Sequence, residues 1–319
     1  MDDLELILMN NLALYVVTVL VWGSTWLLIN FQLGVVPVSV SLVYRYALAA
    51  ALLFIWCQIR SLNLRFSATH HARFAAMGAL MFGINYMCTY SAQQYISSSL
   101  NAVAFSAMLW MNILNARMFF GTRSDWSVLI GAVLGMVGVV VLFLPAIESF
   151  TFSDTVLLGA SLCLAGAYSA SLGNMVSQNA QTIKLPVMQS NAWGMAYGVV
   201  FLVAFALIRG DEFTFDPSFA YLGSLLYLSI FGSIVAFGTY LTLLGRIGAA
   251  RAGYAVVMFP AVAVILSLMF EGLELTPRLA IGIALTLAGN VVILWRKNQQ
   301  PTRRGGKDTS NGVVVRARA

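Results

Sequence analysis

The sequence has few charged residues. Only 9% of its 319 residues are charged, whereas 60% are hydrophobic and the mean hydropathy is +0.84. A water-soluble domain carries about 25% charged residues, so this chain has too few polar side chains to cover a water-facing surface. Apolar runs of about 20 residues, the length that crosses a bilayer core, recur along it. The composition therefore predicts a polytopic membrane protein.

Cysteine and histidine are also scarce. Cys57, Cys88 and Cys163 all fall in apolar runs, where we expect small hydrophobic side chains rather than disulfides or metal ligands. The two histidines, His70 and His71, are adjacent in a basic loop, and no intramembrane aspartate pair accompanies them. These absences argue against an enzyme, so we predict no catalytic residue, no metal site and no cofactor.

The apolar runs predict an all-α integral membrane fold with ten transmembrane helices. The segments are bounded by charges, prolines or polar clusters. They cover about residues 12–31, 38–59, 74–95, 99–119, 126–146, 155–177, 187–208, 219–244, 252–270 and 279–295.

The loop charges predict that both termini are cytoplasmic. In that orientation the outer loops hold only Arg209 and Arg278. The inner loops and helix ends hold Arg60, Arg65, Arg73, Arg117, Arg123, Lys184, Arg246 and Arg251. Such an excess of basic residues marks the cytoplasmic side. Residues 296–319 form a basic segment without apolar periodicity, predicted to be a disordered cytoplasmic tail that contacts lipid rather than nucleic acid.

The chain contains an internal repeat. A shift of 151 residues lays 96–142 on 247–293 without a gap and matches 11 of 47 positions. The shared glycines are Gly121/Gly272, Gly131/Gly282 and Gly138/Gly289, and small residues at such spacing let helices approach closely. The shift spans five predicted helices, an odd number, so equivalent helices would cross in opposite directions. We predict two inverted five-helix repeats, 1–147 and 148–295, as in many secondary transporters.

Several segments carry a family resemblance. They are VWGSTWLLIN (21–30), SLVYRYALAAALL (41–53), SLCLAGAYSASLGNMVSQ (161–178) and the run from Ser229 to Ile265. In their order and spacing the chain resembles the EamA-type members of the drug/metabolite transporter superfamily. The resemblance implies ten helices in two inverted bundles, a central cavity and movement of small metabolites, often outward. One departure is FFGTRSD (119–125), where family members commonly carry a Glu-Arg or Glu-Lys pair.

The first predicted helix contains the most unusual candidates. Trp22 and Trp26 are four residues apart and share a helix face with Thr25. One interpretation is an aromatic wall for an organic substrate, with a hydroxyl nearby. The other is helix packing, with the indole N–H groups bonded to neighbouring carbonyls.

Arg45 is the only charged residue deep inside a predicted span. An intramembrane ionisable residue is a functional candidate, here as a binder of an anion or a carboxylate. The alternatives are that Arg45 extends to the outer headgroups, or that it ties two helices together.

The other candidates are polar or aromatic residues within apolar segments. Amides rarely face lipid because of their desolvation cost, although hydrogen bonds between helices explain them as well as substrate contact does. The residues are Asn85, Tyr86, Tyr90, Trp110, Asn112, Tyr168, Asn174, Tyr240 and Tyr254.

These observations favour a secondary transporter of the bacterial inner membrane. We expect an exporter of small amphipathic metabolites, such as amino acids or related compounds, working by alternating access through a midplane cavity. Exporters of organic cations or drugs, and a transport-inactive scaffold or sensor of the same fold, remain alternatives. The expected partners are a small-molecule metabolite and the lipid bilayer, with the protein a monomer or a weak homodimer. No Asp or Glu lies within a predicted span, so a buried carboxylate proton relay has little support.

Overall fold

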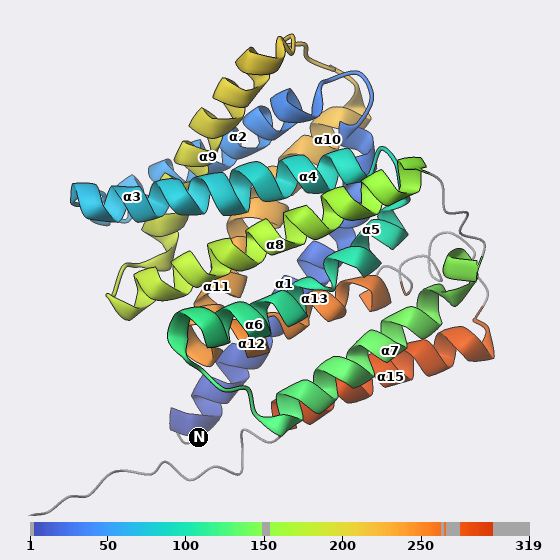
Figure 1. The fold of residues 1–319 in the computed structure, drawn as a ribbon. Coiled ribbons are helices and arrows are strands. Elements are labelled where there is room, and N and C mark those ends of the chain that lie inside the picture. The colour runs from blue at the N-terminus through green and yellow to red at the C-terminus, as the bar shows by residue number, and fades with distance from the viewer. Residues whose placement is uncertain (1–2, 149–153, 263–264, 266–274, 296–319) are drawn as a thin grey trace, which may run out of the picture.

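The computed structural model describes residues 3–148, 154–262, 265 and 275–295, and throughout this part of the chain the regular elements are helices, with no strand (Figure 1). The elements are α1 (Asp3–Ile29), η1 (Asn30–Gln32), α2 (Val38–Ile59), α3 (Ala68–Met77), η2 (Gly78–Ile84), α4 (Asn85–Ala92), α5 (Ser98–Phe105), α6 (Met108–Phe120), α7 (Trp126–Glu148), α8 (Asp154–Thr182), α9 (Val187–Arg209), α10 (Phe219–Tyr227), η3 (Leu228–Val235), α11 (Ala236–Ile247), α12 (Ala249–Ala252), α13 (Tyr254–Val257) and α15 (Pro277–Trp295).

The all-helical membrane fold predicted from the sequence is confirmed. Six described helices are long and apolar enough to cross a bilayer: Asn10–Gln32, Val38–Ile59, Leu100–Phe120, Asp154–Thr182, Val187–Arg209 and Phe219–Ile247. Shorter apolar helices occupy Trp126–Leu142, Ala249–Val262 and Pro277–Gly289, and the segment predicted at 74–95 is helical. The number of spans, their inverted relationship and the cytoplasmic termini stay predictions. Gly272, Glu271 and the tail 296–319 lie outside the described residues.

Helix ends follow local chemistry. The side chains of Ser97 and Ser218 accept hydrogen bonds from the backbone N–H groups of Leu100 and Tyr221, which caps the starts of α5 and α10. Gly121 ends α6 with a φ of 64°, in the left-handed region that glycine adopts without a side-chain clash.

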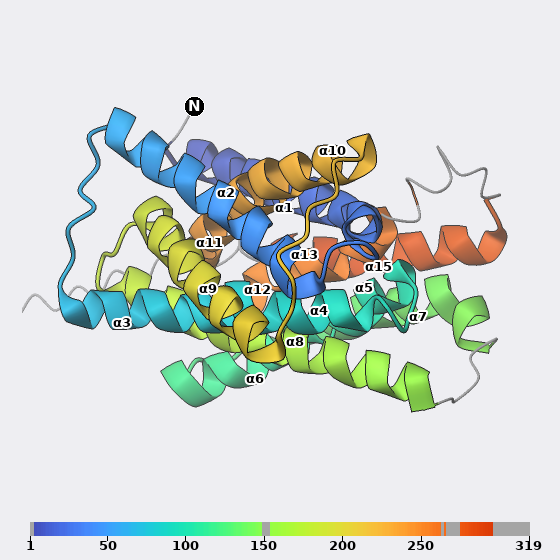
Figure 2. The same cartoon turned by 90° about the horizontal axis from the view of Figure 1, so that it is seen from above.

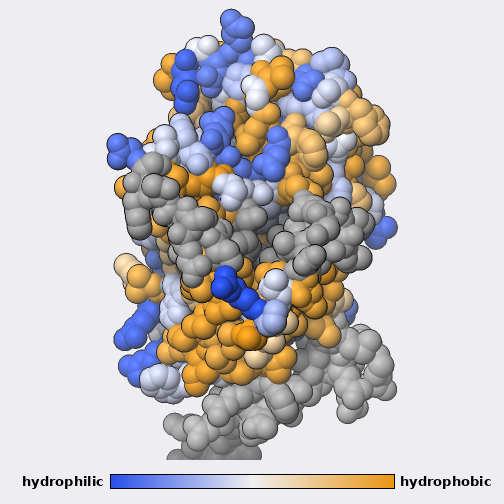
Figure 3. All heavy atoms as spheres, turned by 90° about the vertical axis from the view of Figure 1, so that its right-hand side faces the viewer, coloured by the Kyte–Doolittle hydropathy of each residue, from blue (hydrophilic) through white to orange (hydrophobic). Residues whose placement is uncertain are grey.

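The helices pack mostly as long neighbouring rods, and α7 and α15 lie side by side at one edge of the bundle (Figures 1 and 2). Their backbones approach closely, because a Cβ on Gly289 would lie 2.7 Å from both the Gly131 carbonyl oxygen and the Gly135 amide nitrogen. One end of the bundle carries hydrophilic residues mainly over its upper part and apolar residues around α7 and α15 (Figure 3).

Among the interruptions of the α-helical pattern, four fall at positions about 150 residues apart in pairs. The π-helical segments η2 and η3 begin 150 residues apart, and each lies between two α-helical stretches. Turn residues separate α5 from α6 at Ser106–Ala107 and follow α13 at Met258, which is 151 residues after Ala107. Short π segments occur often at functional sites, and interruptions at matching positions of two repeats point to the binding site of a transporter. Residues beside three of these interruptions line the same cavity.

Candidate binding cavity

A cavity of about 50 Å³ lies among the helices that carry the interruptions. Its lining residues are Trp22, Thr25, Trp26, Ile29, Met81, Asn85, Tyr86, Thr89, Phe105, Met108, Ala170, Asn174, Phe237, Tyr240 and Phe259. Met81 belongs to η2, Phe105 and Met108 flank the turn between α5 and α6, and Phe259 follows Met258. The volume has room for a few water-sized molecules, so an organic solute would require these walls to move apart.

Three pairs of residues that lie 151 positions apart face this cavity. Tyr86 and Phe237, Thr89 and Tyr240, and Met108 and Phe259 are pairs separated by 151 residues, the shift found in the sequence. The first member of each pair comes from α4 or α6. The second comes from α11 or follows α13. Both halves of the chain therefore contribute residues to the cavity.

Trp22 anchors the aromatic wall. Its ring centroid lies 4.8 Å from Phe237, 5.0 Å from Tyr240 and 5.7 Å from Phe259. Its indole Nε1 donates a hydrogen bond of 3.0 Å to the carbonyl oxygen of Gly232 in η3. The ring thus faces the cavity while its indole N–H bonds to the neighbouring helix, as the packing interpretation predicts. A wall for an organic substrate stays a prediction.

Residues around Trp22 explain the unusual Gly-Ser-Thr sequence. The Thr25 hydroxyl donates a hydrogen bond of 2.7 Å to the carbonyl oxygen of Trp22. The Thr25 methyl group lies 3.1 Å from the position that a Cβ on Gly232 would occupy. Gly23 packs against Val262, whose side chain would lie 2.7 Å from an added Cβ. Because Gly23 has no side chain and the Thr25 hydroxyl bonds within its own helix, α1 can approach η3 and the chain after α13 closely.

Buried amides form the polar part of the cavity. Asn174 Nδ2 donates to the Tyr240 hydroxyl at 3.0 Å and to Asn112 Oδ1 at 3.2 Å. Asn112 lies behind the wall, fully buried, and its Nδ2 has no partner among the described residues. Asn85 and Thr89 bond to each other and to their own helix. The cavity therefore offers neutral amide and hydroxyl groups, and its lining residues include no Asp or Glu.

Arg45 lies behind the cavity and is only 1% exposed. Its Nη1 donates to the Tyr90 hydroxyl at 2.8 Å and its Nε to the Ser233 hydroxyl at 3.0 Å, while Nη2 has no partner in the described structure. The guanidinium carbon lies 4.6 Å from the ring centroid of Tyr86, which also lines the cavity. Arg45 is therefore buried in the bundle, and does not extend to the headgroups.

The structure brings seven of the thirteen predicted site residues to the cavity wall: Trp22, Thr25, Trp26, Asn85, Tyr86, Asn174 and Tyr240. Arg45, Tyr90 and Asn112 form a second layer that touches these residues. Trp110 packs on the core outside the wall, and Tyr168 is 47% exposed. Tyr254 donates to the Thr286 carbonyl of α15, away from the cavity.

Sequence reasoning missed several lining residues. They are Ile29, Met81, Thr89, Phe105, Met108, Ala170, Phe237 and Phe259. Most are apolar residues in apolar helices, so neither polarity nor charge distinguishes them. The repeat could have found two: a shift of 151 residues takes Tyr86 to Phe237, and the reverse shift takes Tyr240 to Thr89.

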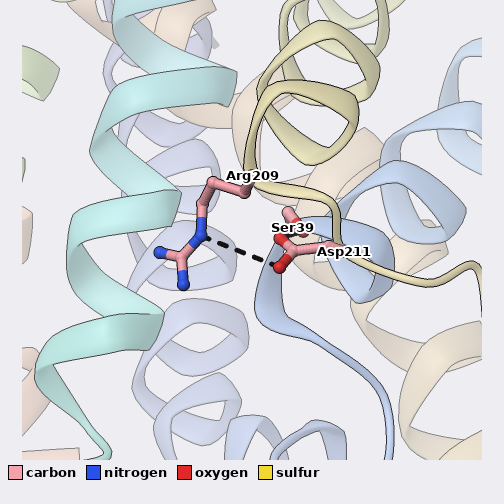
Figure 4. Close-up of polar contacts among 3 residues, drawn as sticks. All are labelled: Ser39, Arg209 and Asp211. Carbon is pink, nitrogen blue, oxygen red and sulfur yellow. Dashed lines mark hydrogen bonds and ion pairs between the residues drawn. The ribbon is translucent and has the colours of Figure 1, made fainter.

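Polar contacts join the two halves at both ends of the bundle. At one end Arg251, at the start of the ninth predicted span, forms an ion pair with Asp125 beside a pocket of about 180 Å³. At the other end Ser39 of α2 donates a hydrogen bond of 2.6 Å to Asp211, and Arg209 lies 3.7 Å from the same carboxylate (Figure 4).

Comparison with known proteins supports a transporter assignment. The profile of the EamA-like transporter family matches residues 10–144 and 157–295. The chain is 29% identical to the uncharacterized inner membrane transporter YedA of Escherichia coli, over 85% of each protein. It is 24% identical to the uncharacterized transporter YoaV of Bacillus subtilis, over 83% of this chain and 89% of YoaV.

A relative whose name states a substrate class and a solved structure also match the chain. The chain is 25% identical to an E. coli protein named "Probable amino-acid metabolite efflux pump", over 89% of this chain and 96% of that protein. A crystal structure at 18% identity superposes with a TM-score of 0.74 over 92% of this chain and 99% of its own, which shows a shared fold. This chain belongs to the EamA-like transporter family of the drug/metabolite transporter superfamily, among multi-pass transporters of the bacterial inner membrane.

Proposed function

We propose that this protein exports small amphipathic metabolites that carry a carboxylate, such as amino acids or related compounds. The observation that carries the proposal is the charge around the cavity. The lining residues include no Asp or Glu, and the nearest buried charge is the guanidinium of Arg45, stacked on Tyr86. A carboxylate would be attracted to this side of the cavity, and a cation would be repelled.

The other groups of the cavity fit the rest of such a substrate. Trp22, Trp26 and Phe237 offer apolar aromatic surfaces, whereas Asn174 and Tyr240 offer neutral hydrogen-bonding groups. The E. coli relative is named as a probable efflux pump for amino-acid metabolites, which agrees with this substrate class. The alternative, export of organic cations, draws support from the same aromatic rings, because cations bind favourably over indole and phenol faces.

The proposed mechanism is alternating access. The two repeats contribute equivalent residues to the cavity and are joined by polar contacts at each end, Arg251 to Asp125 at one and Ser39 to Asp211 at the other. Rocking of one half against the other would break the contacts at one end while keeping those at the opposite end. Asp125 and Asp211 would then act as the ties that hold each end closed.

The test is transport by purified protein in sealed liposomes. The substrates would be a neutral amino acid, the corresponding amino-acid amide and a quaternary ammonium compound, each with and without a pH gradient. The amide lacks the carboxylate and is a cation at pH 7. We expect flux of the amino acid and little flux of the two cations. Flux of the cations alone would replace this substrate class with the organic-cation alternative. Absence of flux for every compound tested would favour the scaffold or sensor alternative.

Arg45→Ala separates the role of the charge from that of the fold. We expect amino-acid flux to fall at least tenfold while residual flux of the amide persists, with the variant still monodisperse on size exclusion. Arg45→Lys keeps the charge but cannot reach Tyr90 and Ser233 together, so it should retain part of the preference for the carboxylate. Unchanged selectivity in Arg45→Ala would leave Arg45 as a helix tie only.

A further inference from the structure

A second, larger groove lies on the outer side of α8, between α3 and α6, and measures about 680 Å³. Its lining residues are Thr69, Ala72, Arg73, Ala76, Leu80, Phe119, Phe120, Leu172, Met175, Val176 and Asn179. None of them lines the central cavity. α3 and α6 each run alongside α8, and the start of α3 lies near the end of α8 (Figure 1).

The groove is polar at one end and apolar along the rest of its length. The lining residues of α3, from Thr69 to Ala76, recur at helical spacing and therefore share one face, and Leu80 follows them in η2. Those of α8, from Leu172 to Asn179, do the same in the opposite direction. Thr69, Arg73 and Asn179 consequently meet at one end, and the walls beyond them are aliphatic or aromatic. Leu80 lies seven residues beyond Arg73, which places about 10 Å of apolar groove behind the polar end.

Arg73 is held in position at the mouth of the groove. Its Nη1 donates to the Thr69 carbonyl at 3.2 Å and its Nε to Asn179 Oδ1 at 3.4 Å, and no partner of Nη2 is found in the described residues. No carboxylate competes for it nearby along the chain, because residues 60–124 and 155–210 contain no Asp or Glu. The mouth therefore has a fixed, uncompensated positive charge beside a hydroxyl and an amide.

We propose that this groove binds an anionic phospholipid, with its phosphate on Arg73 and Thr69 and an acyl chain along Leu80, Leu172 and Val176. The loop charges place this end of α3 on the cytoplasmic side, where a lipid phosphate lies at the depth of Arg73. The small side chains of Ala72 and Ala76 leave the space that the acyl chain fills. A free anion could bind Arg73 but would leave the apolar groove empty. A lipid would fill both parts, so the groove favours a lipid over a free anion.

The experiment is native mass spectrometry of the whole protein, released from detergent micelles that contain phosphatidylglycerol and phosphatidylcholine of the same acyl chains. Three variants accompany the wild type: Arg73→Gln, Ala76→Phe and Arg65→Gln. Arg65 is the matched control, because it is an exposed arginine in the loop just before α3 and does not line the groove. A parallel sample contains 10 mM inorganic phosphate as competitor.

The wild type should retain one phosphatidylglycerol in preference to phosphatidylcholine. Arg73→Gln should reduce this preference about fivefold, which corresponds to about 1 kcal/mol for one basic residue at a lipid surface. Ala76→Phe should reduce the retention of both lipids, and Arg65→Gln should match the wild type. Equal losses in Arg73→Gln and Arg65→Gln would overturn the proposal in favour of a general surface charge. So would retention unaffected by Ala76→Phe, or displacement of the lipid by phosphate.

Discussion

The indole N–H of Trp22 donates a 3.0 Å hydrogen bond to the carbonyl oxygen of Gly232, inside the π-helical segment η3. A π segment shifts the backbone hydrogen-bond register from i→i+4 to i→i+5. Trp22 donates to a carbonyl of η3 from the first half of the chain to the second, and its ring remains on the cavity wall. The bond therefore couples the shape of the cavity to the interruption of the eighth predicted span.

Trp22→Phe should destabilise the protein more than Trp26→Phe does. Both changes keep an aromatic ring in the cavity wall, but only the first leaves a buried carbonyl without its donor, at a cost of about 1–3 kcal/mol. Thermal unfolding of the purified variants in one detergent measures the difference. Equal melting temperatures would show that Gly232 finds another donor.

Asn174→Leu should abolish most transport because it removes the donor shared by Tyr240 and Asn112 at the cavity. The matched control is Asn115→Leu. Asn115 donates a 2.9 Å bond to Ser171 between α6 and α8, but it does not line the cavity. Each change should cost about 1 kcal/mol of stability, as hydrogen bonds between membrane helices do.

The two variants are compared by flux per folded molecule in liposomes. We expect a loss of at least tenfold for Asn174→Leu and near wild-type flux for Asn115→Leu. Similar flux in both would mean that Asn174 serves packing alone, and the polar part of the proposed site would have to lie elsewhere.

The sequence predicted the polar half of the cavity well and the apolar half poorly. Asn174 and Tyr240 stand out because burying a polar group in an apolar helix is costly without a partner. Phe237 and Phe259 carry no such signal. Helices that are apolar on every side also do not show which face points inward. The sequence therefore does not separate Tyr168, which lies at the outer surface, or Tyr254, which lies against α15, from the residues of the wall.

The interruptions of the helices could not be predicted from periodicity. A π segment rotates every later residue of its helix relative to the earlier ones, so residues of α4 and α11 face directions that a regular helix would not give. Gly232 fits its place because Thr25 and the Arg45 guanidinium approach it within about 3.2 Å of a Cβ position. Such a close approach becomes visible only when three segments distant in sequence are brought together.

Gly289→Ala should destabilise the protein, because an added methyl group would meet the backbone of Gly131 and Gly135 at 2.7 Å. Separating α7 from α15 to make room costs about 1–3 kcal/mol. Gly223→Ala is the control: it lies in α10 with no atom within 4 Å of the added Cβ, and alanine favours a helix by about 0.5–1 kcal/mol. Melting temperatures should therefore fall for Gly289→Ala and stay or rise for Gly223→Ala. A fall of equal size in both would contradict the close packing of α7 and α15.

Asp125→Asn should open the end of the bundle that Arg251 and Asp125 tie together, with little effect on stability. The pair is partly exposed, with 32% and 47% of the two side chains accessible, so it contributes at most about 1 kcal/mol. In a conformational equilibrium this amount changes the open population up to about fivefold. The measurement is the rate at which an impermeant maleimide, added on the Arg251 side of sealed vesicles, labels Met108→Cys in a chain whose native cysteines are replaced.

Labelling should speed up two- to fivefold in Asp125→Asn and return to the starting rate in the charge-swapped pair Asp125→Arg with Arg251→Asp. Asp211→Asn, which replaces the charged acceptor of Ser39 at the opposite end with a neutral amide, should not speed labelling from this side, because opening there competes with opening here. If the swapped pair labels as fast as Asp125→Asn, the ion pair does not hold this end closed. Faster labelling in Asp211→Asn would mean that the two ends do not open alternately.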